Sequence, residues 1–191
     1  MANLVQNVVA GKPLATGGIL SGPLKSPLPT DTAATVAAAI KGVGYISDDG
    51  VSLTQGRETD KIKAWGGDVV KIVQTEHSVT LQYTMIEAAR AEVNREVYGE
   101  PNVTATAATT TAGNLLAVRL TADQLPHMSR IVEIKDGDAR MRLVAPDSQI
   151  TEVGDVTFQD ASIISYPVTV ECFPDESGVK LYIYSDDGKK A

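Results

Sequence analysis

VTLQYTM, residues 79–85, is the clearest secondary-structure signal in this chain of 191 amino acids. Its apolar and polar residues alternate with a period of two, which is the pattern of a half-buried β-strand. One face of this strand therefore belongs to the core, and the other face is polar and uncharged. The apolar residues are Val79, Leu81, Tyr83 and Met85, and the polar ones are Thr80, Gln82 and Thr84.

Two glycine-containing turns precede this strand. The pair Gly66-Gly67 separates two strand-like runs and predicts the tip of a hairpin. Further upstream, Asp48-Asp49-Gly50 predicts a turn between residues 43–47 and a run that starts at Val51.

Two segments carry helical signals. Apolar residues recur at three- and four-residue spacings after the strand, which predicts an amphipathic helix at about residues 86–98 that ends at Gly99. The Ala-rich segment Thr30–Ile40 predicts one or two further helical turns, because Asp31 is able to cap a helix N-terminus.

The rest of the chain has sequence patterns typical of β-strands. The predicted strands cover residues 103–111, 115–120, 130–135, 139–144, 166–173 and 179–184. Residues 136–138 and 174–178 are typical of hairpin connections between them. Because only one substantial helix stands among so many strands, we predict a mainly β protein, an antiparallel sandwich or barrel with one flanking helix.

Length and composition favour one domain with an extended N-terminal arm. A chain of this length with 43% hydrophobic residues buries one sizeable core, which we place in residues 31–191. The glycines and prolines of residues 1–30 are unfavourable in helices and at most hydrogen-bonded positions of a sheet. We therefore predict that this segment is the extended arm. It is too apolar to stay in water, and either folds back on its own domain or packs on a neighbouring copy. Its candidate contact residues are Val5, Val8, Val9, Leu20 and Leu24.

The charge balance disfavours tight binding to nucleic acid. Residues 1–95 carry nine charges of each sign, so the whole net charge of −7 lies in residues 96–191. Binding to phosphate backbones through counterion release needs clusters of lysine and arginine, and the sequence has none. Acidity is compatible with a wall past which nucleic acid moves without sticking, and equally with an ordinary soluble surface.

Candidates for catalysis or metal binding are few. Cys172 lies in an apolar strand pattern and is read as a buried small hydrophobe. His77 and His127 have no ligands at zinc-site spacing, and the acidic pairs at 48–49, 175–176 and 186–187 are typical of turns. We therefore predict no catalytic, cofactor-binding or metal site. No window is apolar enough to span a membrane, which favours synthesis and assembly in a cytoplasm.

A spaced set of motifs, most of them within residues 43–88, gives the chain a family resemblance. They are Leu28-Pro29-Thr30-Asp31, Gly44-Tyr45 with Asp49-Gly50, the run KIKAWGG at 61–67, and the strand that leads into the helix at Ile86. As a spaced set they resemble the major tail tube subunits of bacteriophages with long, non-contractile tails, particularly phages of actinobacteria.

This resemblance implies a structural virion protein and not an enzyme. Subunits of this kind are β-sandwiches that form hexameric rings, stacked into a tube through which the genome is ejected. The implied partners are further copies of the chain, a tape-measure protein in the lumen, and tail tip and terminator proteins. The double-stranded DNA passes through without specific binding, and no membrane is involved.

The resemblance also suggests which segments bridge successive rings. The arm at residues 1–30 and the segment at about 47–65 are the matching candidates, which adds Ile62 and Trp65 to the contact residues. The side chain of Trp65 either fills a local core or anchors an interface between chains. The enrichment of tryptophan at protein interfaces favours the interface.

The polar face of the strand at residues 79–85 provides the residues that we predict to face the lumen of the tube, namely Thr80, Gln82 and Thr84. The alternative is that these residues face ordinary solvent. A different function, a virion-surface decoration or carbohydrate-binding module, would call for exposed aromatic rings, and the chain has only nine Phe, Trp and Tyr residues. A hydrolase is disfavoured because no catalytic constellation is present.

Overall fold

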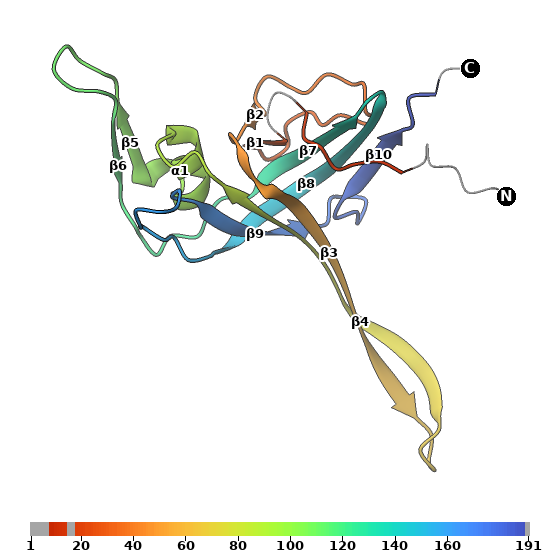
Figure 1. Cartoon of the computed structure of the whole chain (residues 1–191). Helices are drawn as coiled ribbons and strands as arrows, with labels where there is room; N and C mark the ends of the chain where they lie inside the picture. The colour runs from red at the N-terminus through yellow and green to blue at the C-terminus, as the bar shows by residue number, and fades with distance from the viewer. Residues whose placement is uncertain (1–7, 15–17, 190–191) are drawn as a thin grey trace.

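One curved antiparallel sheet organises the protein (Figure 1). The computed structural model describes residues 8–14 and 18–189. The strand order is β2-β1-β7-β8-β9-β4-β3, and β10 also pairs with β8. The strands are β1 Ile19–Pro23, β2 Lys41–Gly42, β3 Ile46–Lys63, β4 Val69–Met85, β7 Met128–Asp136, β8 Ala139–Val153, β9 Tyr166–Phe173 and β10 Tyr182–Asp186. A mainly β, antiparallel fold is confirmed.

Three smaller elements flank this sheet. Helix α1, Ala91–Tyr98, packs on one of its faces and is followed by a short 3-10 turn, Glu100–Asn102. Strands β5, Val103–Thr106, and β6, Leu115–Val118, form a separate two-stranded hairpin that projects from the body beside α1 (Figure 1).

The alternation predicted for residues 79–85 is confirmed. These residues form the C-terminal part of β4, in which Val79, Leu81, Tyr83 and Met85 are buried. The turn predicted at Gly66-Gly67 also forms, and it joins β3 to β4. Both glycines have positive φ angles, 116° and 97°, which glycine adopts without steric penalty.

The main core lies on the face of the sheet that α1 covers. Val93 and Val97 of the helix join the buried residues of β4, β8 and β9 in one cluster. Small and β-branched side chains dominate this cluster, as the composition predicts. Cys172 is buried within it, and burial raises the pKa of its thiol to about 11.

A second, smaller cluster lies on the opposite face of the sheet, and there the helix predicted for Thr30–Ile40 is wrong. Asp31 does accept hydrogen bonds from the backbone N–H groups of Ala33 and Ala34, as a helix cap would. The guanidinium of Arg142, however, binds the carbonyl oxygens of Asp31 and Ala34 at 2.7 and 2.9 Å. These carbonyl oxygens therefore accept hydrogen bonds from a side chain of the sheet and not from the N–H groups of a helix. The segment crosses the sheet as irregular chain, and its Ile40 packs on Ile131 and Val144.

The turn predicted at Asp48-Asp49-Gly50 is also wrong. Strand β3 continues through these residues, and the register against β4 shifts between Ile46 and Val51. Gly50 does take a positive φ of 72°, but it sits in a bulge and not in a hairpin turn. The consequence is one strand of 18 residues where the sequence predicts two shorter ones.

The helix predicted at 86–98 begins later, at Ala91. The backbone N–H of Ile86 donates to the carbonyl of Tyr45, which keeps the start of the segment attached to the end of the sheet. Arg90 forms an ion pair with Glu87 at 3.1 Å and precedes the helix in an extended conformation. The amphipathic pattern is thus right, but its first turn does not belong to the helix.

Two C-terminal connections differ from the prediction. The strand predicted at residues 103–111 ends at Thr106, and residues 107–114 form the loop of the β5–β6 hairpin. Residues 174–178 do not connect a hairpin, because β9 and β10 pair with successive parts of the same edge of β8. The chain between them leaves the sheet and returns to it.

The N-terminal segment partly joins the sheet. Residues 19–23 are strand β1, which pairs with β7, and Ile19 is fully buried. Upstream, the N–H of Leu14 donates to the carbonyl of Glu133, so residues 12–14 also run along β7. This part of the predicted arm folds back on its own domain. The division at residue 30 stays a prediction.

Candidate assembly surfaces

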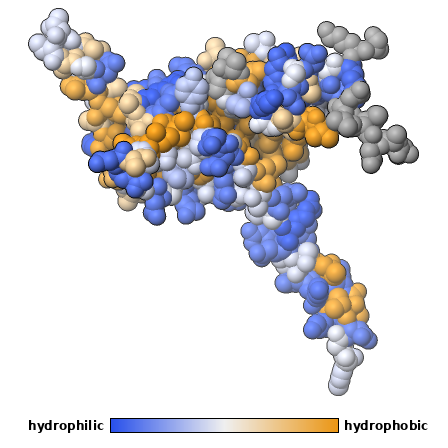
Figure 2. All heavy atoms as spheres, viewed as in Figure 1, coloured by the Kyte–Doolittle hydropathy of each residue, from blue (hydrophilic) through white to orange (hydrophobic). Residues whose placement is uncertain are grey.

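Strands β3 and β4 continue past the sheet as a long hairpin (Figure 1). Strand β9 pairs with β4 only from Thr80 to Met85, so the rest of the hairpin has no third strand. We call residues 60–73 the hairpin tip, and residues 54–59 with 74–79 the shaft. Figure 2 shows a hydrophilic shaft and a hydrophobic patch close to the end of the hairpin.

The hairpin tip exposes an unusual number of large apolar side chains. They are Ile62, Trp65, Val69, Val70, Ile72 and Val73. Trp65, beside the glycine turn, is fully exposed and so is not a plug of the local core. A soluble protein does not normally leave such a group in water, and a patch of this kind marks a binding surface.

Both faces of the hairpin tip are apolar. Directly paired residues share a face, and neighbours along a strand lie on opposite faces. Ile72 pairs with Lys61, whereas Val73, on the other face, pairs with Asp60. A partner that covers only one face would leave the other face in water.

The shaft is polar and is braced at its base. Arg57 donates to the side-chain oxygen of Gln74 across the strands at 3.3 Å, and the side chains of Gln55 and His77 lie within 3.0 Å of each other. Lys180, which follows β9, donates to the carbonyl of His77. These contacts fix the direction in which the hairpin leaves the body.

The other predicted contact residues lie in different surroundings. Val8, Val9 and Leu24 are exposed, whereas Leu20 is half-buried against the Ile131 cluster of its own chain. Val5 lies outside the described residues. The part that these residues and Ile62 and Trp65 take in contacts between copies stays a prediction.

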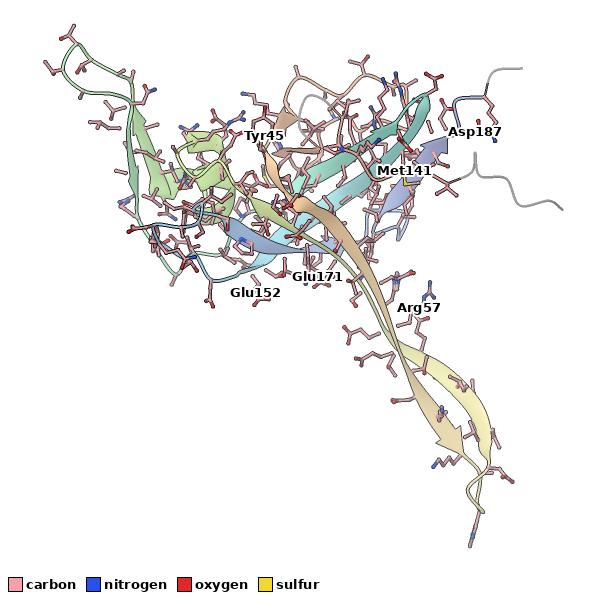
Figure 3. All side chains as sticks on the ribbon, in the orientation of Figure 1. Tyr45, Arg57, Met141, Glu152, Glu171 and Asp187 are labelled. Carbon is pink, nitrogen blue, oxygen red and sulfur yellow. The ribbon has the colours of Figure 1, made fainter. Side chains whose placement is uncertain are left out.

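The predicted lumen residues lie on a shared polar face. Gln82 pairs with Ser52 of β3 and with Thr169 of β9, and its amide donates to the Thr169 hydroxyl at 3.5 Å. Next to it, Thr80 pairs with Thr54 and Glu171. We call this set the polar face: Ser52, Thr54, Thr80, Gln82, Thr84, Thr169 and Glu171. Its one charged member is acidic, and Glu152 adds a second carboxylate opposite Thr169 (Figure 3).

A buried ion pair fastens α1 to the sheet. The guanidinium of Arg130, on β7, binds the carboxylate of Glu96, and the two side chains are only 2% and 9% exposed. Arg130 also donates to the hydroxyl and the carbonyl of Ser148 on β8, at 2.9 and 3.1 Å. The guanidinium of Arg130 therefore links helix α1 to strands β7 and β8. The sequence gives no sign of this pair, because its members are 34 residues apart.

The residues considered for chemistry do not form a site. His127 binds Asp147 at 2.6 Å and packs on Phe173, and His77 lies at the base of the shaft. Within residues 8–14 and 18–189, no group of three or more His, Cys, Asp or Glu side chains is arranged to hold a metal ion. Among the same residues, no helix is long and apolar enough to cross a membrane.

An exposed apolar projection such as the hairpin tip is typical of subunits that bind other protein chains. A family model described as phage tail tube protein matches residues 3–190. The chain belongs to the phage tail tube protein family, so it is a structural component of a phage tail and part of the virion. The resemblance to phage tail tube proteins drawn from its sequence is confirmed. None of the curated proteins matches the chain.

Several solved structures are similar to this chain at low sequence identity. The tube-terminating cap of the anti-feeding prophage has 9% identity and a TM-score of 0.46, over 97% of this chain and 100% of that chain. The sheath-tube complex of the extracellular contractile injection system PVC, in its extended state, has 7% identity and a TM-score of 0.46, over 97% and 100%. The sheath/tube terminator of the same system has 8% identity and a TM-score of 0.43, over 90% and 96%.

Proposed function

We propose that this protein polymerises as stacked rings of six copies into the tube of a long, non-contractile phage tail. The tube is the conduit through which the double-stranded genome is ejected into the host. One observation carries the proposal: a long hairpin ends in a tip with two apolar faces and no partner in its own chain, as far as the structure describes it. A surface of this kind is stable in water only when another chain covers it.

The polar face is the proposed inner wall of the tube. Its hydroxyls and amide interact weakly with a polyanion, and its acidic side chains repel one. Lysine or arginine in the same place would bind phosphates and hold back the genome. The proposal thus gives Thr80, Gln82 and Thr84 a role in ejection, in place of simple contact with solvent.

The proposed partners follow from the same role. They are other copies of the chain, a tape-measure protein in the lumen, and tail tip and terminator proteins, and assembly takes place in the host cytoplasm. The protein catalyses no reaction and holds no cofactor. The family match favours this role over a virion-surface decoration or a carbohydrate-binding module.

Negative-stain electron microscopy of the purified chain at high concentration tests the proposal. The expected result is hollow tubes or stacked rings, with six-fold symmetry in end-on views. A tail-tip complex is added in a parallel sample, because some polymers grow only from an initiator. Monodisperse particles in both samples would contradict the proposal.

Cysteine labelling tests the position of the polar face. Cys172 is buried and its pKa is raised to about 11, so it leaves little background reactivity. The variant Gln82→Cys is expected to react with a small maleimide in monomers and in tubes. A polymer-linked maleimide, too bulky for a narrow lumen, is expected to label monomers but to leave tubes almost unlabelled. Equal labelling of tubes and monomers by the bulky reagent would place Gln82 outside the lumen.

A further inference from the structure

The N-terminal segment covers an edge of strand β7 that β1 leaves free. Strand β1 pairs with residues 128–132 of β7. Further along β7 the chain runs antiparallel to the strand a second time, and there Pro13 lies opposite Ile134. We call residues 10–14 the edge cap, because without them the last part of β7 would have an open edge on this side.

The edge cap is held mainly by its backbone. The N–H of Leu14 donates to the carbonyl of Glu133 at 3.1 Å, and the N–H of Lys135 donates to the carbonyl of Lys12 at 2.8 Å. Leu14 is half-buried, whereas residues 10–13 are exposed. A segment with few hydrogen bonds and little buried apolar surface detaches at a far lower cost in free energy than global unfolding.

One side chain holds the N-terminal end of the edge cap. The carboxylate of Asp136 accepts hydrogen bonds from the N–H of Ala10 at 2.9 Å and from the ammonium group of Lys12 at 3.4 Å. The N–H of Ala10, and after it Lys12, hold the pKa of Asp136 below its ordinary value. The linkage is reciprocal, so the ionised carboxylate in turn favours the attached segment.

A glycine makes room for the edge cap beside β1. A Cβ atom at Gly18 would lie 2.9 Å from the Cβ atom of Pro13. Two carbon atoms in favourable contact are roughly 3.5–4.0 Å apart, so a larger residue at position 18 would push the edge cap away from β7. Attachment of the edge cap thus depends on Asp136 and on Gly18.

The chain directly before the edge cap is apolar and open to water. Val8 and Val9 are 76% and 40% exposed. Contact of these side chains with another chain would gain hydrophobic free energy that the attached edge cap does not supply. Attachment to β7 holds both residues beside their own domain and therefore competes with such a contact.

We propose that the edge cap is closed on β7 in the free subunit and opens when the subunit assembles. This inference rests on the proposed self-assembly and adds its regulation. The closed cap keeps the edge of β7 paired, which protects it from pairing with a wrong strand. It also withholds Val8 and Val9 from other chains. A subunit that assembles only in its open form has an apparent affinity reduced by the open fraction, so closure keeps free subunits apart.

Two opening variants weaken the closed state by different means. Asp136→Asn removes the charge that binds the segment, and Gly18→Ala places a methyl group against the edge cap. In monomers of both variants, amide hydrogen exchange at Leu14 and Lys135 is expected to be at least about tenfold faster. The control Asp138→Asn makes the same change of charge at an exposed neighbour and is expected to leave this exchange unchanged.

Assembly is the second readout of the opening variants. Because the open fraction rises, the concentration needed for assembly is expected to fall by at least about threefold in both of them. The control variant is expected to assemble at the concentration of the unchanged chain. Urea denaturation of the monomers checks that the body of the protein keeps its stability.

A disulfide that holds the edge cap closed tests the reverse. Pro13 and Ile134 lie opposite each other between the two backbone hydrogen bonds, in a non-hydrogen-bonded pair. The Cα atoms of such pairs are about 4.5 Å apart, within the roughly 4.4–6.8 Å that a disulfide spans. Pro13→Cys with Ile134→Cys is expected to stay monomeric when oxidised and to assemble once it is reduced. Cys172 is buried and does not compete for the new thiols.

Two results would overturn the proposal. One is assembly of the oxidised disulfide variant at the same concentration as the reduced one, since the edge cap would then stay closed in the assembly. The other is unchanged hydrogen exchange in both opening variants. Faster exchange in both variants of a chain that never forms tubes would support the detachable edge cap and contradict the proposed tube, so the two failures are distinguishable.

Discussion

A chain in which Trp65, Val70 and Ile72 are replaced by serine is expected to stay monomeric at concentrations at which the unchanged chain assembles. The three residues are 107%, 63% and 59% exposed, and they belong to the turn and to strand β4 of the hairpin tip. They contribute little to the folded monomer because they are not buried in it. In an assembly they lose contact with water, and burying each large apolar side chain contributes roughly 1.5–3 kcal/mol.

Stability and association separate the two effects of this triple variant. Its free energy of unfolding, from urea denaturation, is expected to stay within about 0.5 kcal/mol of that of the unchanged chain. Sedimentation velocity and electron microscopy measure the loss of assembly. The matched control is the serine variant of Leu120, Phe158 and Ile163, which are similarly exposed outside the hairpin. Assembly by the triple variant, or equal loss in the control, would contradict a specific role of the hairpin tip.

Replacing Arg130 with alanine is expected to destabilise the monomer by about 3–5 kcal/mol, the largest effect on folding that we anticipate from one side chain. The change leaves the buried carboxylate of Glu96 without its cation, and the Ser148 carbonyl and hydroxyl lose a donor. The removal of a single partner costs far more than the net contribution of the pair, because the remaining charge stays out of water. Urea denaturation measures the change.

Two further variants show whether the unpaired charge is the cause. Arg90→Ala removes a pair with Glu87 whose side chains are 40% and 27% exposed, and is expected to cost less than about 1 kcal/mol. Arg130→Met combined with Glu96→Leu removes both charges and is expected to recover most of the loss. An equal loss in the double variant and in Arg130→Ala would point to packing and not to charge.

The sequence predicted best those elements whose pattern reflects local burial. The strand at 79–85 and the strand at 166–173 alternate because one face of each packs on the core. The turn at Gly66-Gly67 was predictable because it needs positive φ angles. In each case the local pattern and the tertiary surroundings favour the same structure.

Elements were mispredicted where a distant group decides the backbone. Arg142 binds carbonyls of Asp31 and Ala34, more than a hundred residues away, and no helix pattern contains that information. The Asp48-Asp49-Gly50 motif gives the correct positive φ at Gly50, but whether it forms a turn or a bulge depends on how β4 pairs with β3.

The hairpin tip was found only in part. Ile62 and Trp65 were predicted from the family resemblance, whereas Val69, Val70, Ile72 and Val73 were missed. A signal was present, because the run VVKIV at 69–73 is apolar at both odd and even positions. In an antiparallel sheet with one solvated face, such a run indicates a strand that is covered on both sides.

The unbroken course of β3 from the sheet into the hairpin has a mechanical consequence. A pull on the end of the hairpin is transmitted through the two strands directly into the core. Ladder hydrogen bonds lie perpendicular to the strands, so axial tension loads those between β4 and β9 in shear, and they must rupture together before the hairpin slides out of the sheet. A two-stranded ribbon nevertheless twists easily. A filament whose links are such ribbons is strong when stretched along its length and compliant when bent.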